Sequence, residues 1–155
     1  VHELQKEVFQ QQIDLAKELQ KPLMIHGRPE KGNEDAYQDI VDMLAPHNGD
    51  ITGNVHFFVG SNEMRDKFKA LAFTVSVTGV ITFTDDYNAM VENADKDMLL
   101  AETDSPYVAP KPHRGTRNSA LNVVYVYEKI ANLWGISQED AQEQLTSNTK
   151  RVFGL

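Results

Sequence analysis

Hydrophobic residues along this chain follow two patterns, helical spacing and short continuous apolar runs. Apolar residues at helical spacing, or a polar stretch of helix-forming composition, predict the helices. These cover residues 4–19, 35–44, 62–71, 85–94 and 120–134, with a last helix after Ser137. Ser61 and Ser137 stand where helix N-caps are expected, and Asp140 completes a capping box with Ser137. The first helix is predicted to gather its apolar side chains on one face, namely Val8, Phe9, Ile13, Ala16 and Leu19.

Four apolar runs separate these helices and are predicted to be strands, at residues 23–25, 54–58, 73–79 and 98–102. Apolar strands that alternate with helices are typical of a parallel sheet covered by helices. The predicted fold class is therefore α/β, in a single domain over residues 1–155. In such sheets, functional residues gather beyond the carboxyl ends of the strands.

Side chains that can bind metal follow three of the four predicted strands. The first strand ends at His26, the second contains His56, and the fourth leads into Glu102 and Asp104. Since parallel strands bring their carboxyl ends to one rim, two imidazoles and a carboxylate can meet there and hold Zn²⁺, Mn²⁺ or Mg²⁺. A carboxylate beside a metal-bound water can also orient that water for hydrolysis. The third strand ends at Gly79, where a ligand can approach the backbone closely.

Structural roles compete with this interpretation. A single histidine at a strand end is commonly a hydrogen-bonded structural residue, and Asp104 before Ser105-Pro106 suits a turn. The residues alone leave both interpretations open.

A long loop over residues 105–119 follows the last strand and is rich in proline and basic residues. Its length suggests a function, and His113, Arg114 and Arg117 are candidates for binding substrate phosphate, because arginine pairs with phosphate oxygens through two parallel hydrogen bonds. Arg28 lies on the same predicted rim, two residues after His26. A solvated loop and a structural ion pair at Arg28 remain the alternatives.

Composition narrows the possible partners. The net charge of −8 excludes a broad basic surface, so any contact with nucleic acid depends on local arginines or on metal. The chain has no cysteine, which excludes disulfides and thiolate metal ligands. No apolar run approaches the ~20 residues of a membrane span, and a cytoplasmic protein without a membrane partner is expected.

Five segments resemble the TatD family of metal-dependent deoxyribonucleases in order and spacing: PLMIHGR, VHFFVGS, VSVTGVITF, LLAETDSPYVAPKPHRGTRN and NTKRVFGL. The resemblance implies a TIM-type (β/α) barrel of the amidohydrolase kind. It further implies hydrolysis of DNA phosphodiester bonds with divalent metal (Mg²⁺, Mn²⁺ or Zn²⁺), often as a 3′–5′ exonuclease on single-stranded DNA.

The same resemblance implies roles for individual residues. His26 and His56 match metal-binding histidines, the latter in a motif that the family writes HCF and this chain writes HFF. Asp104 matches the aspartate that binds metal and positions the attacking water, and Glu102 matches the glutamate of the same motif, with a catalytic role. Arg114 and Arg117 align with the basic loop of the family.

The chain also departs from the family pattern. The family's His-x-His strand and its metal-bridging glutamate strand have no counterpart here, and Asn118-Ser119-Ala120 replaces Asn-Glu-Pro. Because a TIM barrel takes roughly 250 residues, the chain is expected to be the C-terminal portion of a barrel. An N-terminal segment or self-association would then complete the sheet. The alternatives to a nuclease are a non-catalytic metal-binding or assembly module and a metal-dependent hydrolase of another substrate.

Overall fold

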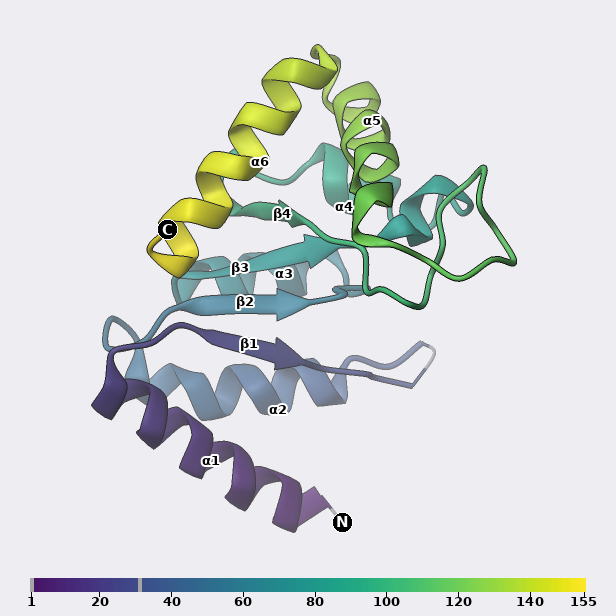
Figure 1. Cartoon of the computed structure of the whole chain (residues 1–155). Coiled ribbons are helices and arrows are strands. Elements are labelled where there is room, and N and C mark those ends of the chain that lie inside the picture. Colours follow the sequence, from purple (N-terminus) through teal and green to yellow (C-terminus); the bar gives the residue numbers. More distant parts are fainter. Residues whose placement is uncertain (1, 31) are drawn as a thin grey trace.

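The computed structural model describes residues 2–30 and 32–155 of the chain. Its centre is a parallel four-stranded sheet in the order β1-β2-β3-β4, so neighbours in sequence are neighbours in the sheet (Figure 1). The register places His26 of β1 directly beside His56 of β2. The predicted parallel sheet is therefore confirmed. Its strands are β1 (Leu23–His26), β2 (Gly53–His56), β3 (Phe73–Val77) and β4 (Leu99–Ala101).

Helices connect the strands and follow the last one, and α2 and α3 lie behind the sheet in Figure 1. Short 3-10 turns precede or follow several of these elements, and η2 (Gly79–Thr82) follows β3 after one residue, Thr78. The helices are α1 (His2–Leu19), α2 (Asp35–Leu44), α3 (Asn62–Ala70), α4 (Asn88–Glu92), α5 (Val123–Trp134) and α6 (Gln138–Phe153).

The predicted helix caps are confirmed, whereas the predicted ends of several strands and of one helix were wrong. The Ser61 hydroxyl accepts from the Met64 amide at the start of α3, and the Ser137 hydroxyl does the same for Asp140. Strand β1 ends at His26 as predicted, whereas β2, β3 and β4 differ at their ends from the predicted ranges. Strand β2 ends at His56 because Phe57 turns into the left-handed region at φ 50°. The predicted helix over 85–94 forms only as α4, over five residues.

The two faces of the sheet differ in polarity. Successive side chains on a strand point to opposite faces, and one face carries Val55, Val75 and Leu99, which belong to the same hydrophobic core as buried residues of α2 and α3. The opposite face of the two central strands carries polar residues. The prediction of strands that are apolar throughout was thus wrong for β2 and β3, where Asn54, Thr74 and Ser76 are buried polar residues.

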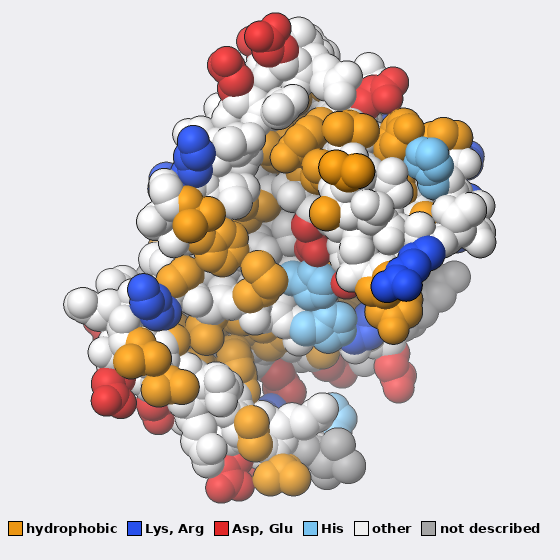
Figure 2. All heavy atoms as spheres, viewed as in Figure 1, with side chains coloured by type: hydrophobic (Ala, Val, Ile, Leu, Met, Phe, Trp, Pro, Cys, Tyr) orange, Lys and Arg blue, Asp and Glu red, His pale blue; other side chains and the backbone are white. Residues whose placement is uncertain are grey.

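Helix α1 and strand β1 leave apolar side chains exposed. Within the predicted apolar face of α1, Ile13 and Ala16 are buried, whereas Val8 and Leu19 are 47% and 56% exposed. Met24 in β1 is 62% exposed, and within the described part of the chain β1 pairs with β2 alone. Figure 2 shows hydrophobic side chains spread over this side of the molecule. The apolar face predicted for α1 is therefore buried at only some of its positions.

Asn148, the first residue of the C-terminal segment NTKRVFGL, attaches α6 to the sheet. The buried amide of Asn148 donates to the carbonyls of Leu99 at 2.8 Å and Lys96 at 2.6 Å. These bonds fix the start of β4, the strand that leads into Glu102. Of the described helices, none combines the length and the hydropathy that crossing a membrane requires.

Candidate metal centre

Three side chains at the carboxyl ends of the strands form a cluster that we call the metal trio: His56, Glu102 and Asp104. One ligand atom from each lies within 4.8 Å of the others, and all three residues are partly buried. His56 ends β2, while Glu102 and Asp104 follow β4, so β3 lies between the two contributors. In Figure 2 histidine side chains lie beside acidic ones in the middle of the visible face.

Glu102 fixes the orientation of His56. The Nδ1 atom of His56 lies 2.8 Å from Oε2 of Glu102, and a carboxylate can only accept, so Nδ1 carries the proton. In the neutral imidazole the other ring nitrogen, Nε2, keeps its lone pair, and it lies 3.9 Å from Oδ1 of Asp104. A carboxylate that holds the far nitrogen of a histidine is the usual support for a metal-binding imidazole.

Two further donors hold the Glu102 carboxylate in place. The Phe57 amide donates to Oε1 at 2.8 Å, and the Ser76 hydroxyl donates to the same oxygen at 2.5 Å. The Ser76 hydroxyl in turn accepts a hydrogen bond from the side-chain amide of Asn54 at 2.9 Å. With both oxygens engaged, Glu102 is arranged to position His56.

Sequence reasoning did not identify Ser76 as part of this site. The residue lies in β3, two positions after Thr74, and both are buried on the face of the sheet that carries His56. Polar residues at a spacing of two within an otherwise apolar strand were the available signal. The hydroxyl of Thr74 donates to the Asn54 side chain at 3.1 Å, so the polar network reaches from the sheet interior to the metal trio.

The donor set of the metal trio fits a divalent cation. The His56 imidazole and the Asp104 carboxylate suit Zn²⁺ or Mn²⁺, and a carboxylate also suits Mg²⁺, while Glu102 supports the imidazole. The 3.9 Å between His56 Nε2 and Asp104 Oδ1 can be spanned by one ion about 2.0–2.2 Å from each atom. A divalent metal cofactor is consistent with this geometry.

His26 lies next to the metal trio without belonging to it. Its ring centroid is 5.3 Å from that of His56, with the two planes tilted by 41°. The paired register of β1 and β2 brings the two imidazoles together, because both residues end their strands. The structure thus places His26, predicted as a ligand, at the same rim, and its side chain is exposed.

Asp104 is presented by a tight turn at the start of the long loop. Asp104 has φ 52°, and its carbonyl accepts from the Tyr107 amide at 2.9 Å. The buried side chain of Asn118 closes this turn by donating to the carbonyls of Thr103 and Tyr107. Asn118 therefore ties the far end of the loop to the segment that carries Asp104.

The basic residues of the loop have different surroundings. The Arg114 guanidinium lies 3.8 Å from the ring centroid of Phe83, and the His113 ring reaches the Tyr125 hydroxyl of α5 at 2.9 Å. Arg117 is exposed to solvent. Arg114 and His113, both predicted to bind phosphate, thus contact aromatic side chains of neighbouring segments.

Gly79 faces the backbone of the 105–119 loop, whereas a ligand was predicted to approach it. A Cβ on Gly79 would lie 2.6 Å from the Val108 carbonyl oxygen and 3.0 Å from the Pro110 nitrogen. The backbone of the 105–119 loop thus occupies the place that we expected a ligand to approach. Gly79 allows the loop to pack directly against the end of β3.

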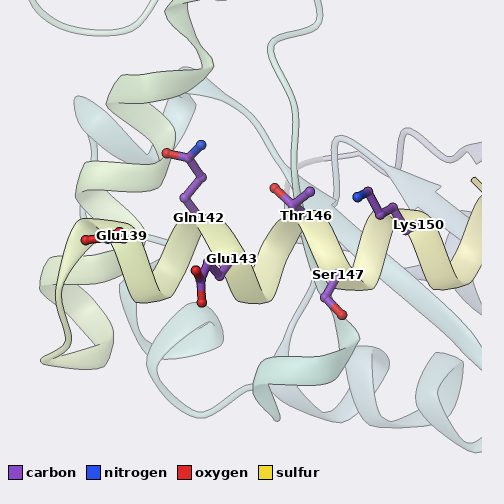
Figure 3. Close-up of a pocket in the computed structure, with 6 residues that line it drawn as sticks. All are labelled: Glu139, Gln142, Glu143, Thr146, Ser147 and Lys150. Atoms are coloured by element: carbon purple, nitrogen blue, oxygen red, sulfur yellow. The ribbon is translucent and has the colours of Figure 1, made fainter.

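A shallow depression on the outer side of α6 carries no comparable chemistry. Figure 3 shows its lining residues projecting from that single helix. They are Glu139, Gln142, Glu143, Thr146, Ser147 and Lys150.

Comparison with known proteins identifies the family. Residues 1–154 match the family described as TatD related DNase. The chain belongs to this family. It is 38% identical to an uncharacterized metal-dependent hydrolase, YabD, of Bacillus subtilis, with 99% of this chain and 59% of the relative covered. It is 35% identical to the similarly named YcfH of Escherichia coli, with 97% of this chain and 56% of the relative covered.

Solved structures of a TatD homologue and of a dihydroorotase share the fold. YJJV, a TatD homologue from Escherichia coli, superposes with a TM-score of 0.88 at 23% identity, covering 99% of this chain and 57% of that one. A dihydroorotase from Campylobacter jejuni gives a TM-score of 0.60 at 18% identity, over 92% of this chain and 50% of that one. The chain thus has the α/β fold of TatD and amidohydrolase barrels and spans little more than half the length of the relatives it matches.

Proposed function

We propose that this TatD-family chain acts in metal-dependent hydrolysis of DNA phosphodiester bonds, as a cytoplasmic 3′–5′ exonuclease on single-stranded DNA. The observation that carries the proposal is the fixed orientation of His56, whose Nδ1 is held by Glu102 while Nε2 faces Asp104 at 3.9 Å. The family description and the names of the relatives support a metal-dependent hydrolase.

Each residue of the site has a distinct part in the proposed reaction. His56 and Asp104 would hold a divalent ion (Mg²⁺, Mn²⁺ or Zn²⁺), with His26 as a further ligand from β1. Such an ion polarises a phosphoryl oxygen and lowers the pKa of a bound water. Asp104 orients the attacking water and accepts its proton, and Glu102 acts as a positioning residue by keeping His56 in one tautomer.

Local cationic side chains are proposed to bind the DNA backbone. Arg28 follows β1 on the same rim as His26, and Arg114 and Arg117 lie in the 105–119 loop, which follows Asp104. His113 is an additional candidate in that loop. Because the net charge is −8, attraction to phosphate depends on these few residues.

We further propose that another segment pairs with the edge of β1 to extend the sheet toward a barrel. The edge of β1 at which no described strand pairs, the exposed Met24 and the greater length of the relatives support an additional strand–helix segment as the occupant. Light scattering checks this idea, since a concentration-dependent dimer would instead indicate a second copy of the chain.

Nuclease assays test the main proposal. The protein is incubated with single-stranded DNA and Mg²⁺ or Mn²⁺, with and without chelator, and wild type is compared with Asp104→Asn. We expect cleavage that the chelator abolishes and that Asp104→Asn reduces by about 10²- to 10⁴-fold, the usual contribution of a general base. Asp86→Asn, an exposed aspartate before α4, is the matched control and should cleave like wild type.

Two outcomes would contradict the proposal. Cleavage that is unchanged in Asp104→Asn would remove this residue from the mechanism. Metal binding by a folded protein without any cleavage would instead favour a non-catalytic module, and hydrolysis of another ester or an amide would favour a different substrate.

A further inference from the structure

Phe57 is a large apolar residue that lies outside the hydrophobic core. The next residue, Phe58, is fully buried in that core, whereas Phe57 is only partly buried and belongs neither to the core nor to the apolar side chains packed around it. Removing an aromatic ring from water is a major source of stability. A ring left at the rim therefore calls for another explanation.

The ring is held beside the metal trio. Phe57 adopts φ 50°, an uncommon conformation for a bulky residue, and its amide donates to Oε1 of Glu102 at 2.8 Å. Its ring stands nearly perpendicular to the His56 ring, at 76° and 6.2 Å between centroids. The hydrogen bond that supports the metal trio thus also sets the position of the Phe57 backbone.

A planar cation already lies over this ring. The Arg28 guanidinium carbon is 5.2 Å from the Phe57 ring centroid, and the Arg28 side chain is exposed. Guanidinium groups stack on aromatic faces and also bind phosphate. Since Arg28 is exposed, its guanidinium can leave the ring and bind a phosphate while another planar group takes its place.

We propose that Phe57 and Arg28 form a nucleobase subsite beside the metal trio. The ring stacks on a base of single-stranded DNA, and the guanidinium pairs with an adjoining phosphate. This inference rests on the proposed nuclease function and deepens it. Stacking on an aromatic ring tolerates any base, so the subsite serves an enzyme that proceeds along a strand without sequence preference.

Binding measurements with matched ligands test the subsite. Fluorescence anisotropy compares a labelled phosphorothioate oligothymidylate, which resists cleavage, with a phosphorothioate abasic oligomer of equal length, both with Mg²⁺. Phe57→Leu keeps an apolar side chain and removes the flat ring, and Phe57→Trp restores one. Phe153→Leu in α6 is the control, because this partly buried phenylalanine lines a hollow with Ile51 and Thr52 before β2, at the opposite end of the strands.

We expect Phe57→Leu to weaken binding of the oligothymidylate by roughly tenfold, as loss of one stacked base implies. Binding of the abasic oligomer should stay within about twofold of wild type, and both Phe57→Trp and Phe153→Leu should bind the two ligands like wild type. Circular dichroism establishes that each variant is folded.

The result that overturns the subsite is equal affinity of wild type and Phe57→Leu for the oligothymidylate, or equal weakening for both ligands. If wild type still cleaves DNA in that case, the subsite fails and the nuclease function stands. If wild type binds neither ligand and cleaves no DNA, both proposals fail together.

Discussion

The His56 imidazole donates from Nδ1 to the Glu102 carboxylate, with 2.8 Å between Nδ1 and Oε2. The bond joins the end of β2 to the segment after β4 across the intervening strand β3, whose Ser76 hydroxyl donates to the same carboxylate. The site therefore depends on three adjacent strands, and its geometry is set by the sheet.

Replacing Glu102 with glutamine should weaken metal binding while leaving the fold intact. Glutamine retains an oxygen that can accept from the Phe57 amide and removes the charge that keeps His56 in one tautomer. We expect metal affinity, measured by isothermal titration calorimetry, to fall about 10- to 100-fold. Glu63→Gln, at a carboxylate exposed on α3, is the control, and an unchanged affinity in Glu102→Gln would contradict the positioning role.

Replacing Arg117 with glutamine should reduce the salt dependence of DNA binding. If this exposed side chain contacts one phosphate, the slope of log K against log salt for single-stranded DNA should decrease by about 0.7. The measurement is a salt series of anisotropy titrations. Lys150→Gln on the outer side of α6 (Figure 3) serves as the charge-matched control, and equal slopes for both variants and wild type would refute the contact.

Replacing Asn148 with leucine should destabilise the fold. The substitution keeps the branched arrangement of side-chain heavy atoms and leaves the carbonyls of Lys96 and Leu99 without this donor. We expect the free energy of unfolding in urea to fall by about 2–3 kcal/mol, because the buried Asn148 side chain makes both lost hydrogen bonds. Ser147→Ala, at an exposed position on the same helix, should change it little, and equal stability of the two variants would show that Asn148 does not fasten α6.

Replacing Tyr37 with phenylalanine should change stability in alkaline solution. Burial raises the pKa of the Tyr37 hydroxyl, against the effect of the hydrogen bond from the Val59 amide at 3.1 Å. The folded state therefore holds this proton more tightly than the unfolded chain does, whose tyrosine pKa is about 10. The contribution to stability is complete below pH ~10 and is lost as the pH rises through the folded-state value.

Urea unfolding at several pH values checks this expectation. Near neutral pH the Tyr37→Phe variant should be about 1 kcal/mol less stable, because the Val59 amide loses its acceptor. Above pH ~10 its stability should decline less steeply than that of wild type. Parallel declines would show that the Tyr37 hydroxyl is not protected from ionisation by the fold.

Local sequence signals predicted most of the elements and part of the site. Serine caps at Ser61 and Ser137 were sufficient to locate the starts of α3 and α6. The alternation of apolar runs with helices predicted a parallel sheet, and hence a shared rim for His26 and His56, whose rings lie 5.3 Å apart. These features depend on neighbours in the chain, which is why the sequence alone could indicate them.

Only the tertiary structure decided the relationships between residues on different strands. The sequence determined that Glu102 and Asp104 follow an apolar strand, but the register of β2, β3 and β4 turns Glu102 toward His56 and Ser76. The left-handed backbone of Phe57 likewise leaves this residue at the rim, although its apolar character resembles that of buried Phe58. Periodicity sets which side of its own element a residue occupies, whereas the groups that it meets there come from distant segments brought together by folding.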